Sequence, residues 1–410
     1  MIGSLYSGIS GLKANTSAMA VIGDNIANVD TTGFKASRVS FANIFSASLS
    51  QTSVQIGRGV TLNEVNPQWE SGSVENTTSA TDLSINGSGL FMVNDPSGGG
   101  SYYTRAGKFD WDKDGNLVTP DGFITQGYAI DPNTGAIGGI GDITLPNGTS
   151  APNPTQNISF GMNLNSDAVV GDTFTSSITT YDSLGSEAVL DIDFTRTATG
   201  WDWGVNVSHD NPLAASVSAG SIVFDATGNL DPAASTPANA NPTIVLTGID
   251  PAATPMTINW NYLDAAGASD GSITGYSSES SKTAQSQDGY PSGSLQSVAV
   301  DEDGYFTGIY SNGSMIPFAQ LAIADFASYS GLAKQGSNLY AESLGSGQAL
   351  IGAPNSAGMG SIAPSTLEMS NVDLGTEFVE MITTQRAFQA NSKVITTSDE
   401  ILSELLNIKR

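Results

Sequence analysis

Residues 371–410 read NVDLGTEFVEMITTQRAFQANSKVITTSDEILSELLNIKR, and this stretch decides the fold. Alternating steps of four and three residues place mostly apolar side chains on one stripe: Leu374, Phe378, Met381, Gln385, Phe388, Ser392, Ile395, Asp399, Leu402 and Leu406. A repeat near 3.5 residues is typical of a helix that packs on another helix as a coiled coil. At 1.5 Å per residue this helix would be roughly 55–60 Å long, too long for a small core to cover. The sequence therefore predicts a long helix that needs a helical partner.

Both ends of this predicted helix carry residues that stabilise helix termini. Asn371 is a candidate N-cap, and Asp373 and Glu377 lie in or near the first turn, where the helix dipole favours acidic groups. Lys409 and Arg410 lie at the other end, where the dipole favours cations.

The first residues of the chain supply the predicted partner. They place a second stripe on one helical face: Ile2, Leu5, Ile9, Leu12, Thr16, Met19, Ile22, Ile26 and Val29. Turn-forming residues over 28–33 then end the segment. Two interpretations remain open: the helices pack on one globular domain, or the chain polymerises through its ends. A β-rich middle between two helical ends favours polymerisation, with the apolar members of both stripes forming the packed core.

Composition narrows the available chemistry. The 410 residues include no cysteine and a single histidine, His209, which argues against disulfides, thiol chemistry, His-based catalytic triads and His-clustered zinc sites. The net charge is −26, whereas residues 1–50 and 367–410 are each close to neutral. An acidic middle argues against binding to nucleic acid or to an anionic membrane, and near-neutral ends can pack against copies of themselves.

No stretch of the sequence reaches the ~18–20 apolar residues of a membrane span. The N-terminal stretch does not have the pattern of a cleavable secretion signal, because glycine and serine interrupt its apolar residues. We therefore expect no membrane insertion, and export would need a route without a cleaved signal peptide.

The middle of the chain predicts antiparallel β-structure. Asn-Gly and Asp-Gly pairs accept positive φ and mark tight turns. These pairs occur at 86–87, 114–115, 121–122, 147–148, 270–271, 288–289, 303–304 and 312–313. The clearest strand covers 190–195, where apolar and polar residues alternate.

The expected fold class is α+β: long N- and C-terminal helices form a coiled-coil core, with discontinuous, mainly antiparallel β domains between them. Turn formers at 146–157 and a polar stretch at 277–288 are interpreted as the two linkers of an insertion. The expected parts are an axial helical core of 1–28 with 371–410, a linker over 29–59, an inner β domain of 60–145 with 288–365, and an outer β domain inserted at 146–287.

One motif has the spacing of a calcium-binding loop. Asp110, Asp112, Asp114, Gly115 and Asp121 match an EF-hand, but the last ligand is Asp rather than Glu and the flanking residues predict strands instead of helices. The simpler interpretation is a hairpin turn at Asp114-Gly115.

The remaining candidates for chemistry have structural explanations. Asp191 and Asp193 lie two apart on one predicted strand, so they share its polar face. Trp201 and Trp203 have the same spacing, which is typical of packing, although aromatic rings can also stack on a sugar. We therefore predict no catalytic residue, no cofactor and no metal ligand.

Short blocks at both ends and in the middle form a recognisable set. They are SGISGL at 7–12, DNIAN at 24–28, TGFK at 32–35, DLSINGSGLF at 82–91, YTRAGKF at 103–109, QGY at 126–128, LEMSNVDL at 367–374 and QRAFQANSK at 385–393. In combination they resemble the rod and hook proteins of the bacterial flagellum. Rod members of that family are shorter and lack a large outer insertion. Because this chain has an insertion at 146–287, it resembles the hook members more than the rod members.

This resemblance implies a structural subunit without enzymatic activity. Its copies would form a curved, hollow helical tube that acts as a universal joint between rod and filament, with the terminal helices lining an export channel. The implied partners are further copies of the chain, the rod, the hook cap, the hook–filament junction proteins and the flagellar type III export apparatus. The implied location is extracellular, in the hook. Phe41 and Phe45, expected on one helical face, are similar to the element that early substrates present to the export gate.

Two alternatives stay open. The nearer is a distal rod-type or junction protein of the same axial family. The more distant is a secreted β-rich protein that binds or cleaves carbohydrate, which would use carboxylates and exposed aromatic residues of 146–287 and would leave the helical ends unexplained.

Overall fold

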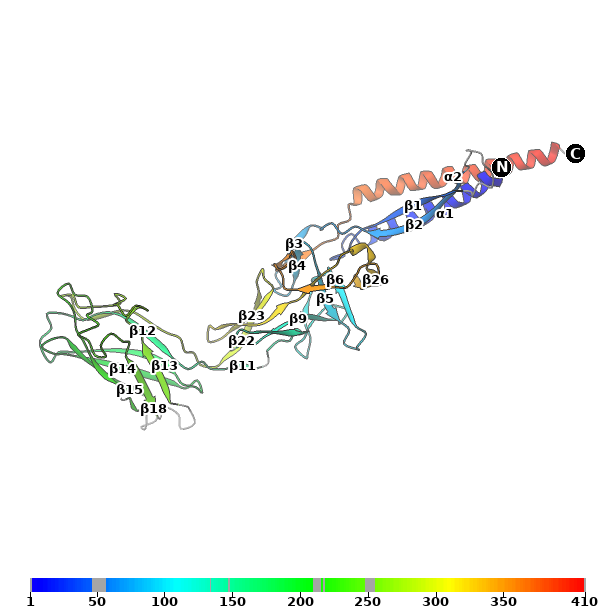
Figure 1. The fold of residues 1–410 in the computed structure, drawn as a ribbon. Coiled ribbons are helices and arrows are strands. Elements are labelled where there is room, and N and C mark those ends of the chain that lie inside the picture. The colour runs from blue at the N-terminus through cyan, green and yellow to red at the C-terminus, as the bar shows by residue number, and fades with distance from the viewer. Residues whose placement is uncertain are drawn as a thin grey trace. The chain divides into compact units, whose positions relative to one another are not determined.

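The computed structural model describes residues 2–45, 57–132, 134–146, 148–208, 215–216, 218–247 and 255–408. His209, Lys409 and Arg410 lie outside the described residues, as do the side chains of Phe45 and Leu406. The chain divides into two compact units (Figure 1). The first unit contains 1–147, 298–308 and 316–410, and the second contains 148–297 and 309–315.

Two helices near the chain ends lie side by side in the first unit (Figure 1). The helix α1 covers Ile2–Ala27 and α2 covers Leu374–Ile408. They run antiparallel, because the Ser4 hydroxyl lies 3.4 Å from that of Ser398 and Asn25 Nδ2 donates to Glu377 Oε1 at 3.0 Å. Within the described residues, neither helix has the length and apolar character that a bilayer crossing requires.

The start of α2 differs from the sequence-based expectation. Asp373, and not Asn371, caps the helix: its carboxylate accepts from Gly375 N at 2.8 Å and from Thr376 Oγ1 at 2.9 Å. Asn371 instead joins the segment before Ser37 to the segment after Pro67, since its Oδ1 accepts from Ala36 N at 2.8 Å and its Nδ2 donates to the carbonyl groups of Gln68 at 2.9 Å and Glu70 at 3.0 Å. The prediction failed because either residue type can cap a helix, and only the fold decides which side chain is free to do so.

A long hairpin packs along α1. Its strands are β1, Ser37–Phe45, and β2, Gly57–Pro67, which pair antiparallel with a register shift at Ser40/Phe41. Val60 N donates to Ser10 Oγ of α1 at 3.2 Å. The expectation that Phe41 lies on a helical face is therefore wrong, because residues 37–45 are extended and paired.

The β part of the first unit centres on a sheet in which strands follow the order β24-β9-β5-β6-β27-β26. The strands of this region are β3 Val74–Asn76, β4 Leu83–Asn86, β5 Leu90–Asn94, β6 Ser101–Thr104, β7 Asp110–Trp111, β8 Leu117–Val118, β9 Ile124–Ile130, β10 Ile137–Asp142, β23 Tyr305–Tyr310, β24 Met315–Leu321, β25 Ile323–Asp325, β26 Ala333–Gly336, β27 Leu339–Ala341, β28 Leu350–Gly352, β29 Ser361–Pro364 and β30 Thr366–Glu368. A short 3-10 helix covers Tyr329–Gly331. The apolar core of this β part contains Leu83, Phe91, Leu117 and Phe306, each of which is fully buried.

The second unit contains two sheets around one apolar core. One has the order β16-β18-β19-β12-β20 with β21 beside β12, and the other has the order β13-β14-β15-β17. The strands of these two sheets are β12 Asn157–Asn163, β13 Thr173–Tyr181, β14 Glu187–Arg196, β15 Trp201–Ser208, β16 Ala215–Ser216, β17 Ala219–Ile222, β18 Thr243–Thr247, β19 Met256–Trp260, β20 Ile273–Thr274 and β21 Ser281–Gln287. Outside these sheets, β11 Thr149–Ser150 pairs with β22 Gly293–Val300, whose last three residues belong to the first unit. Pairing is mostly antiparallel, but β12 pairs parallel with β19 and β20.

The predicted turns are largely confirmed. The glycine of each Asn-Gly or Asp-Gly pair has positive φ, except Gly289. At that pair Asp288 instead accepts from Gln156 N at 2.8 Å and Asn157 N at 3.0 Å, so it holds the two linker segments of the second unit together. The alternation over 190–195 is also confirmed, since Leu190, Ile192 and Phe194 are buried on one face of β14.

Candidate assembly interface

Two glycines of α1, Gly8 and Gly11, lie directly against α2. The buried face of α1 consists of Gly8, Gly11, Ala14, Ala18, Ile22 and Asn25. A Cβ at Gly11 would lie 2.8 Å from Asn391 Nδ2, and one at Gly8 would lie 3.0 Å from Ile395 Cγ1. The two helices can therefore approach closely, and the larger apolar side chains are left on other faces.

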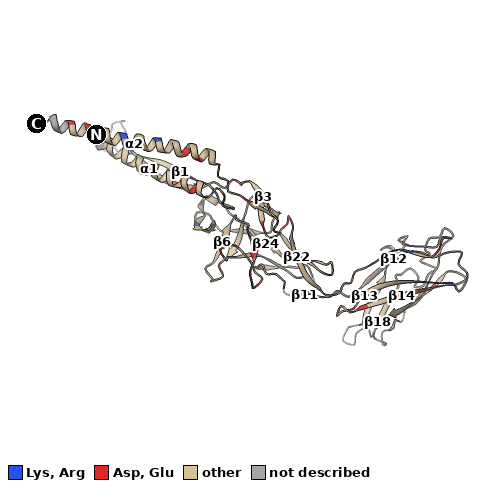
Figure 2. Ribbon diagram, turned by 180° about the vertical axis from the view of Figure 1, so that it is seen from behind, with Lys and Arg blue, Asp and Glu red and all other residues tan. Residues whose placement is uncertain are grey.

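Those larger side chains are exposed in the single chain. The exposed apolar residues of the helix pair are Tyr6, Ile9, Leu374, Phe378, Val379, Ile382, Phe388, Val394 and Ile401. Charge does not shield them on α1, whose charged residues are Lys13 and Asp24; Figure 2 shows this helix almost entirely in the colour of uncharged residues. A group of exposed large apolar side chains on one pair of helices is typical of a site of association.

The predicted stripes fall partly in the contact and partly outside it. On α1, Ile22 is buried, Leu5, Leu12, Met19 and Ile26 are half-buried, and Ile9 is exposed. On α2, Met381, Ile395 and Leu402 are half-buried, and Leu374, Phe378 and Phe388 are exposed. Sequence reasoning missed the glycine and alanine stripe because it followed large apolar residues. The Gly8-x-x-Gly11 spacing was the signal that could have revealed it.

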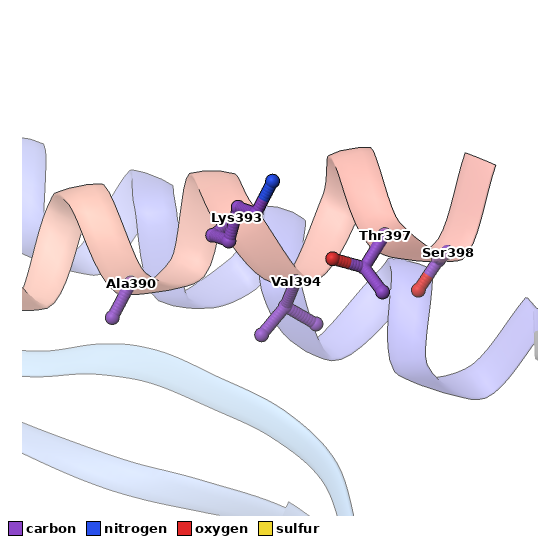
Figure 3. A pocket seen from close by; sticks show the side chains of 5 residues that line it. All are labelled: Ala390, Lys393, Val394, Thr397 and Ser398. Atoms are coloured by element: carbon purple, nitrogen blue, oxygen red, sulfur yellow. The ribbon is translucent and has the colours of Figure 1, made fainter. Parts of the chain in front are cut away.

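An open pocket of about 430 Å³ lies on α2, lined by Ala390, Lys393, Val394, Thr397 and Ser398. Figure 3 shows Ala390 and Val394 pointing to the same side of the helix, while the Lys393 amine points away. The pocket has an apolar floor, and Val394 is 43% exposed. Its shape and lining suit an apolar side chain of a partner better than a polar ligand.

A buried cluster of charges lies where the N-terminal segment, the β-sheet and the segment before α2 meet. Lys35 Nζ and Arg105 Nε donate to the carboxylate of Glu368 at 2.7 Å and 2.6 Å, and all three side chains are at most 6% exposed. Gly72 N donates to the same carboxylate at 3.0 Å, and Lys35 Nζ also donates to the Glu70 carbonyl at 2.7 Å. One carboxylate thus joins parts of the chain that are more than 250 residues apart in sequence.

Arg105 adds a second set of contacts. Its Nη2 donates to the carbonyl groups of Ile85 at 2.7 Å and Gly87 at 2.8 Å, and its Nη1 donates to that of Gly89. These bonds hold the loop between β4 and β5, whose glycines have positive φ. The arginine therefore fixes the loop and the carboxylate in one plane.

Burial and charge act against each other in this cluster. Burial lowers the pKa of Lys35, although Glu368 opposes the shift. Burial alone would raise the pKa of Glu368, but Arg105 and Lys35 outweigh it and hold that pKa below its ordinary value. Glu368 is therefore ionised at neutral pH. Sequence reasoning placed these residues in three separate motifs and had no means of bringing them together.

The candidates for chemistry in the β domains have structural roles. The Asp112 carboxylate accepts from Asp114 N at 2.9 Å and Asn116 N at 2.7 Å inside the turn that connects β7 and β8. This confirms the predicted hairpin turn. Trp201 and Trp203 are buried in the core of the second unit, so their rings are not available to stack on a sugar. The described residues include no acidic, histidine or cysteine group arranged to hold a metal ion.

Family models match four parts of the chain. They are described as flagella basal body rod protein, 5–35; flagellar hook protein FlgE/F/G D1 domain, 84–163; flagellar basal body protein FlaE D2 domain, 164–290; and flagellar basal body rod FlgEFG protein C-terminal, 363–408. The chain is 33% identical to the flagellar hook protein FlgE of Borreliella burgdorferi and 34% identical to that of Treponema pallidum, over the full length of both chains in each case.

The chain belongs to the flagellar hook protein family.

Other members of the hook protein family are about as similar. The FlgE protein of Salmonella typhimurium is 33% identical, with 99% of this chain and 100% of that protein covered. The crystal structure of the Helicobacter pylori flagellar hook protein FlgE2 has a TM-score of 0.53 at 15% identity, covering 72% of this chain and all of that one, and therefore supports the fold alone. The hook family is structural and is not a family of enzymes.

Proposed function

We propose that this chain is the structural subunit of the flagellar hook and polymerises into a curved, hollow helical tube that joins rod to filament. The observation that carries the proposal is the similarity to hook proteins over the whole chain. The exposed apolar residues of α1 and α2 support it, because they give copies of the chain a surface to bury. A head-to-tail interface that does not close produces an open helical polymer.

In this proposal the terminal helices of neighbouring copies pack as a coiled-coil core around the export channel. The proposed core consists of the apolar stripe residues of both helices, including Leu406. The proposed wall consists of the inner β domain, 60–145 with 288–365, and the outer β domain, 146–287. The rod, the hook cap, the junction proteins and the type III export apparatus are the other proposed partners, and Phe41 with Phe45 is the proposed export element. The protein acts outside the cell, reaches the hook without a cleaved signal peptide and catalyses no reaction.

Assembly can be tested with apolar residues of α2 that are more than half exposed in the single chain. Val379 and Ile382 are 61% and 51% exposed and lie three residues apart on α2. We expect the double variant Val379→Ser/Ile382→Ser to remain folded and to lose tube formation in high concentrations of ammonium sulfate, which strengthens apolar burial. Electron microscopy and sedimentation measure the tubes.

The matched control is Gln385→Ser/Gln389→Ser, which changes two exposed polar positions of the same helix. Tubes should form from the wild type and from this control, and none from a chain that lacks 371–410. If the apolar double variant assembles as well as the wild type, the exposed face of α2 is not the assembly surface. If the wild type gives only single particles, the proposed polymer is wrong.

A further inference from the structure

A polar pocket of about 300 Å³ lies in the first unit, next to the charge cluster. Its lining consists of Lys35, Trp69, Glu70, Ser71, Gly87, Ser88, Gly89, Arg105 and Tyr329. Both cations of the cluster face this pocket, whereas Glu368 does not line it. The pocket therefore contains both cations of the cluster together with one acidic residue, Glu70, which is exposed.

The cluster contains two buried cations for one buried carboxylate. Lys35 and Arg105 both bind Glu368, which leaves one positive charge without a counter-charge among the described residues that form ion pairs. The Asp325 carboxylate accepts from Tyr329 Oη at 2.5 Å and from Phe326 N at 2.8 Å, and among the described residues no ion pair joins it to Lys35 or Arg105. An unbalanced buried charge is costly, so a bound anion would stabilise this arrangement.

Hydrogen-bond donors remain unused on the same wall. Lys35 Nζ has three N–H groups and donates to the carbonyl of Glu70 and to Glu368. Arg105 has five and makes four such bonds. Trp69 Nε1 is buried and finds no acceptor in the described part of the chain. A buried donor of this kind calls for an acceptor that the protein itself does not supply.

The ring of Trp69 is held in place. Its centroid lies 5.0 Å from that of Tyr329 and 4.8 Å from that of Tyr340. The hydroxyl of Tyr329 also accepts from Gly89 N at 2.9 Å, which fixes the opposite wall. These contacts hold the indole ring of Trp69 in a fixed position, as a preformed site requires.

We propose that this pocket binds a carboxylate group. One negative charge would balance the excess of two cations over one carboxylate in the cluster, and the two oxygens of a carboxylate offer acceptors to Lys35, Arg105 and Trp69 together. The carboxylate is supplied either by an Asp or Glu side chain of a second copy, since the chain has 40 acidic residues, or by a free small carboxylic acid. The site does not depend on the role of the chain in the hook.

The test follows the indole N–H signal of Trp69 by NMR in protein labelled with ¹⁵N-tryptophan. Trp111, Trp201, Trp203 and Trp260 are internal references, and Trp69→Phe assigns the signal. We expect sodium acetate to move the Trp69 signal downfield in a saturable way, while sodium chloride at equal ionic strength does not. The other four signals should stay in place. Equal shifts with acetate and chloride, or no shift with either acetate or rising protein concentration, would overturn the proposal.

A variant provides an independent check on the charge. Lys35→Met removes one of the two cations, so that Arg105 and Glu368 balance each other, and it should weaken acetate binding about tenfold or more. Lys113→Met is the matched control, because Lys113 is 88% exposed, and it should bind acetate as the wild type does. If Lys35→Met does not fold, the wild-type comparison of acetate with chloride still decides the question. A Trp69 shift that rises with protein concentration in chloride alone identifies the second copy as the source, and a shift with acetate alone identifies a free carboxylate.

Discussion

The charge cluster makes a strong prediction about the variant Glu368→Gln. The change keeps the shape of the side chain but removes the charge that Lys35 and Arg105 share. The NH2 group of the new amide also replaces one of the two oxygens, so it faces either Lys35 or Arg105, each of which is itself a donor. Removing one partner of a buried ion pair costs about 3–5 kcal/mol, because the remaining charges stay buried without compensation. We expect the first unit to lose this amount of unfolding free energy at pH 7.

The assay is urea unfolding followed by the indole signals of the tryptophans. Trp69 and Trp111 report the first unit, whereas Trp201, Trp203 and Trp260 report the second, whose stability should not change. Glu342→Gln is the matched control. Glu342 is exposed and accepts two hydrogen bonds, from Tyr103 Oη at 2.7 Å and from Ala349 N at 3.3 Å, so removing its charge should cost about 1 kcal/mol or less.

The same comparison has a defined pH dependence. The pKa of Glu368 in the folded chain lies below its ordinary value of 4.5, so its stabilising contribution is fully present above about pH 4.5 and is lost as the pH falls through the folded pKa. The difference between wild type and Glu368→Gln should therefore be constant from pH 7 to pH 5 and should shrink in more acidic solution. A loss at pH 7 no larger than that of Glu342→Gln would refute the argument, as would a difference that does not change with acid.

Three further predictions use the same indole signals. Gly107→Ala should destabilise the first unit by about 3 kcal/mol, because a Cβ there would lie 1.7 Å from the Leu83 carbonyl oxygen. The control Gly139→Ala, where a Cβ would have no atom within 4 Å, should change the stability by no more than about 0.5 kcal/mol. Equal effects of the two variants would contradict the close contact at Gly107. Leu190→Ala should cost the second unit about 2–5 kcal/mol, since Leu190 is fully buried, and should leave Trp69 and Trp111 unaffected. Asp288→Asn should cost about 1 kcal/mol at pH 7, a modest value because the group is partly exposed. Burial would raise the pKa of Asp288, but backbone N–H donors outweigh it and lower that pKa, so this cost should fade as the pH falls below 3.8.

Patterns within short stretches of sequence predicted the helices, strands and turns that depend on residues close together in the chain. The 3.5-residue repeat predicted α2, the turn formers after 27 predicted the end of α1, and alternation predicted β14. The Asp114-Gly115 turn was predictable because positive φ is a property of the residues themselves.

Features that depend on distant segments were not predictable in this way. The stretch 37–45 has no clear period, and it is a strand because β2 pairs with it. The α1–α2 contact uses small residues because backbone approach decides it, and hydrophobic periodicity does not report that. The meeting of Lys35, Arg105 and Glu368 required the complete topology of the first unit.

The first unit is discontinuous, and this has a consequence for the order of events during synthesis. Residues 148–297 can complete their own core as soon as they leave the ribosome, but 1–147 cannot complete theirs until the last quarter of the chain has been made. Until Glu368 is made, Lys35 and Arg105 have no buried counter-charge, and closing so long a loop is slow. The part of the chain made first is therefore the part that becomes native last, and a nascent chain stays open at its N-terminal end through most of its translation.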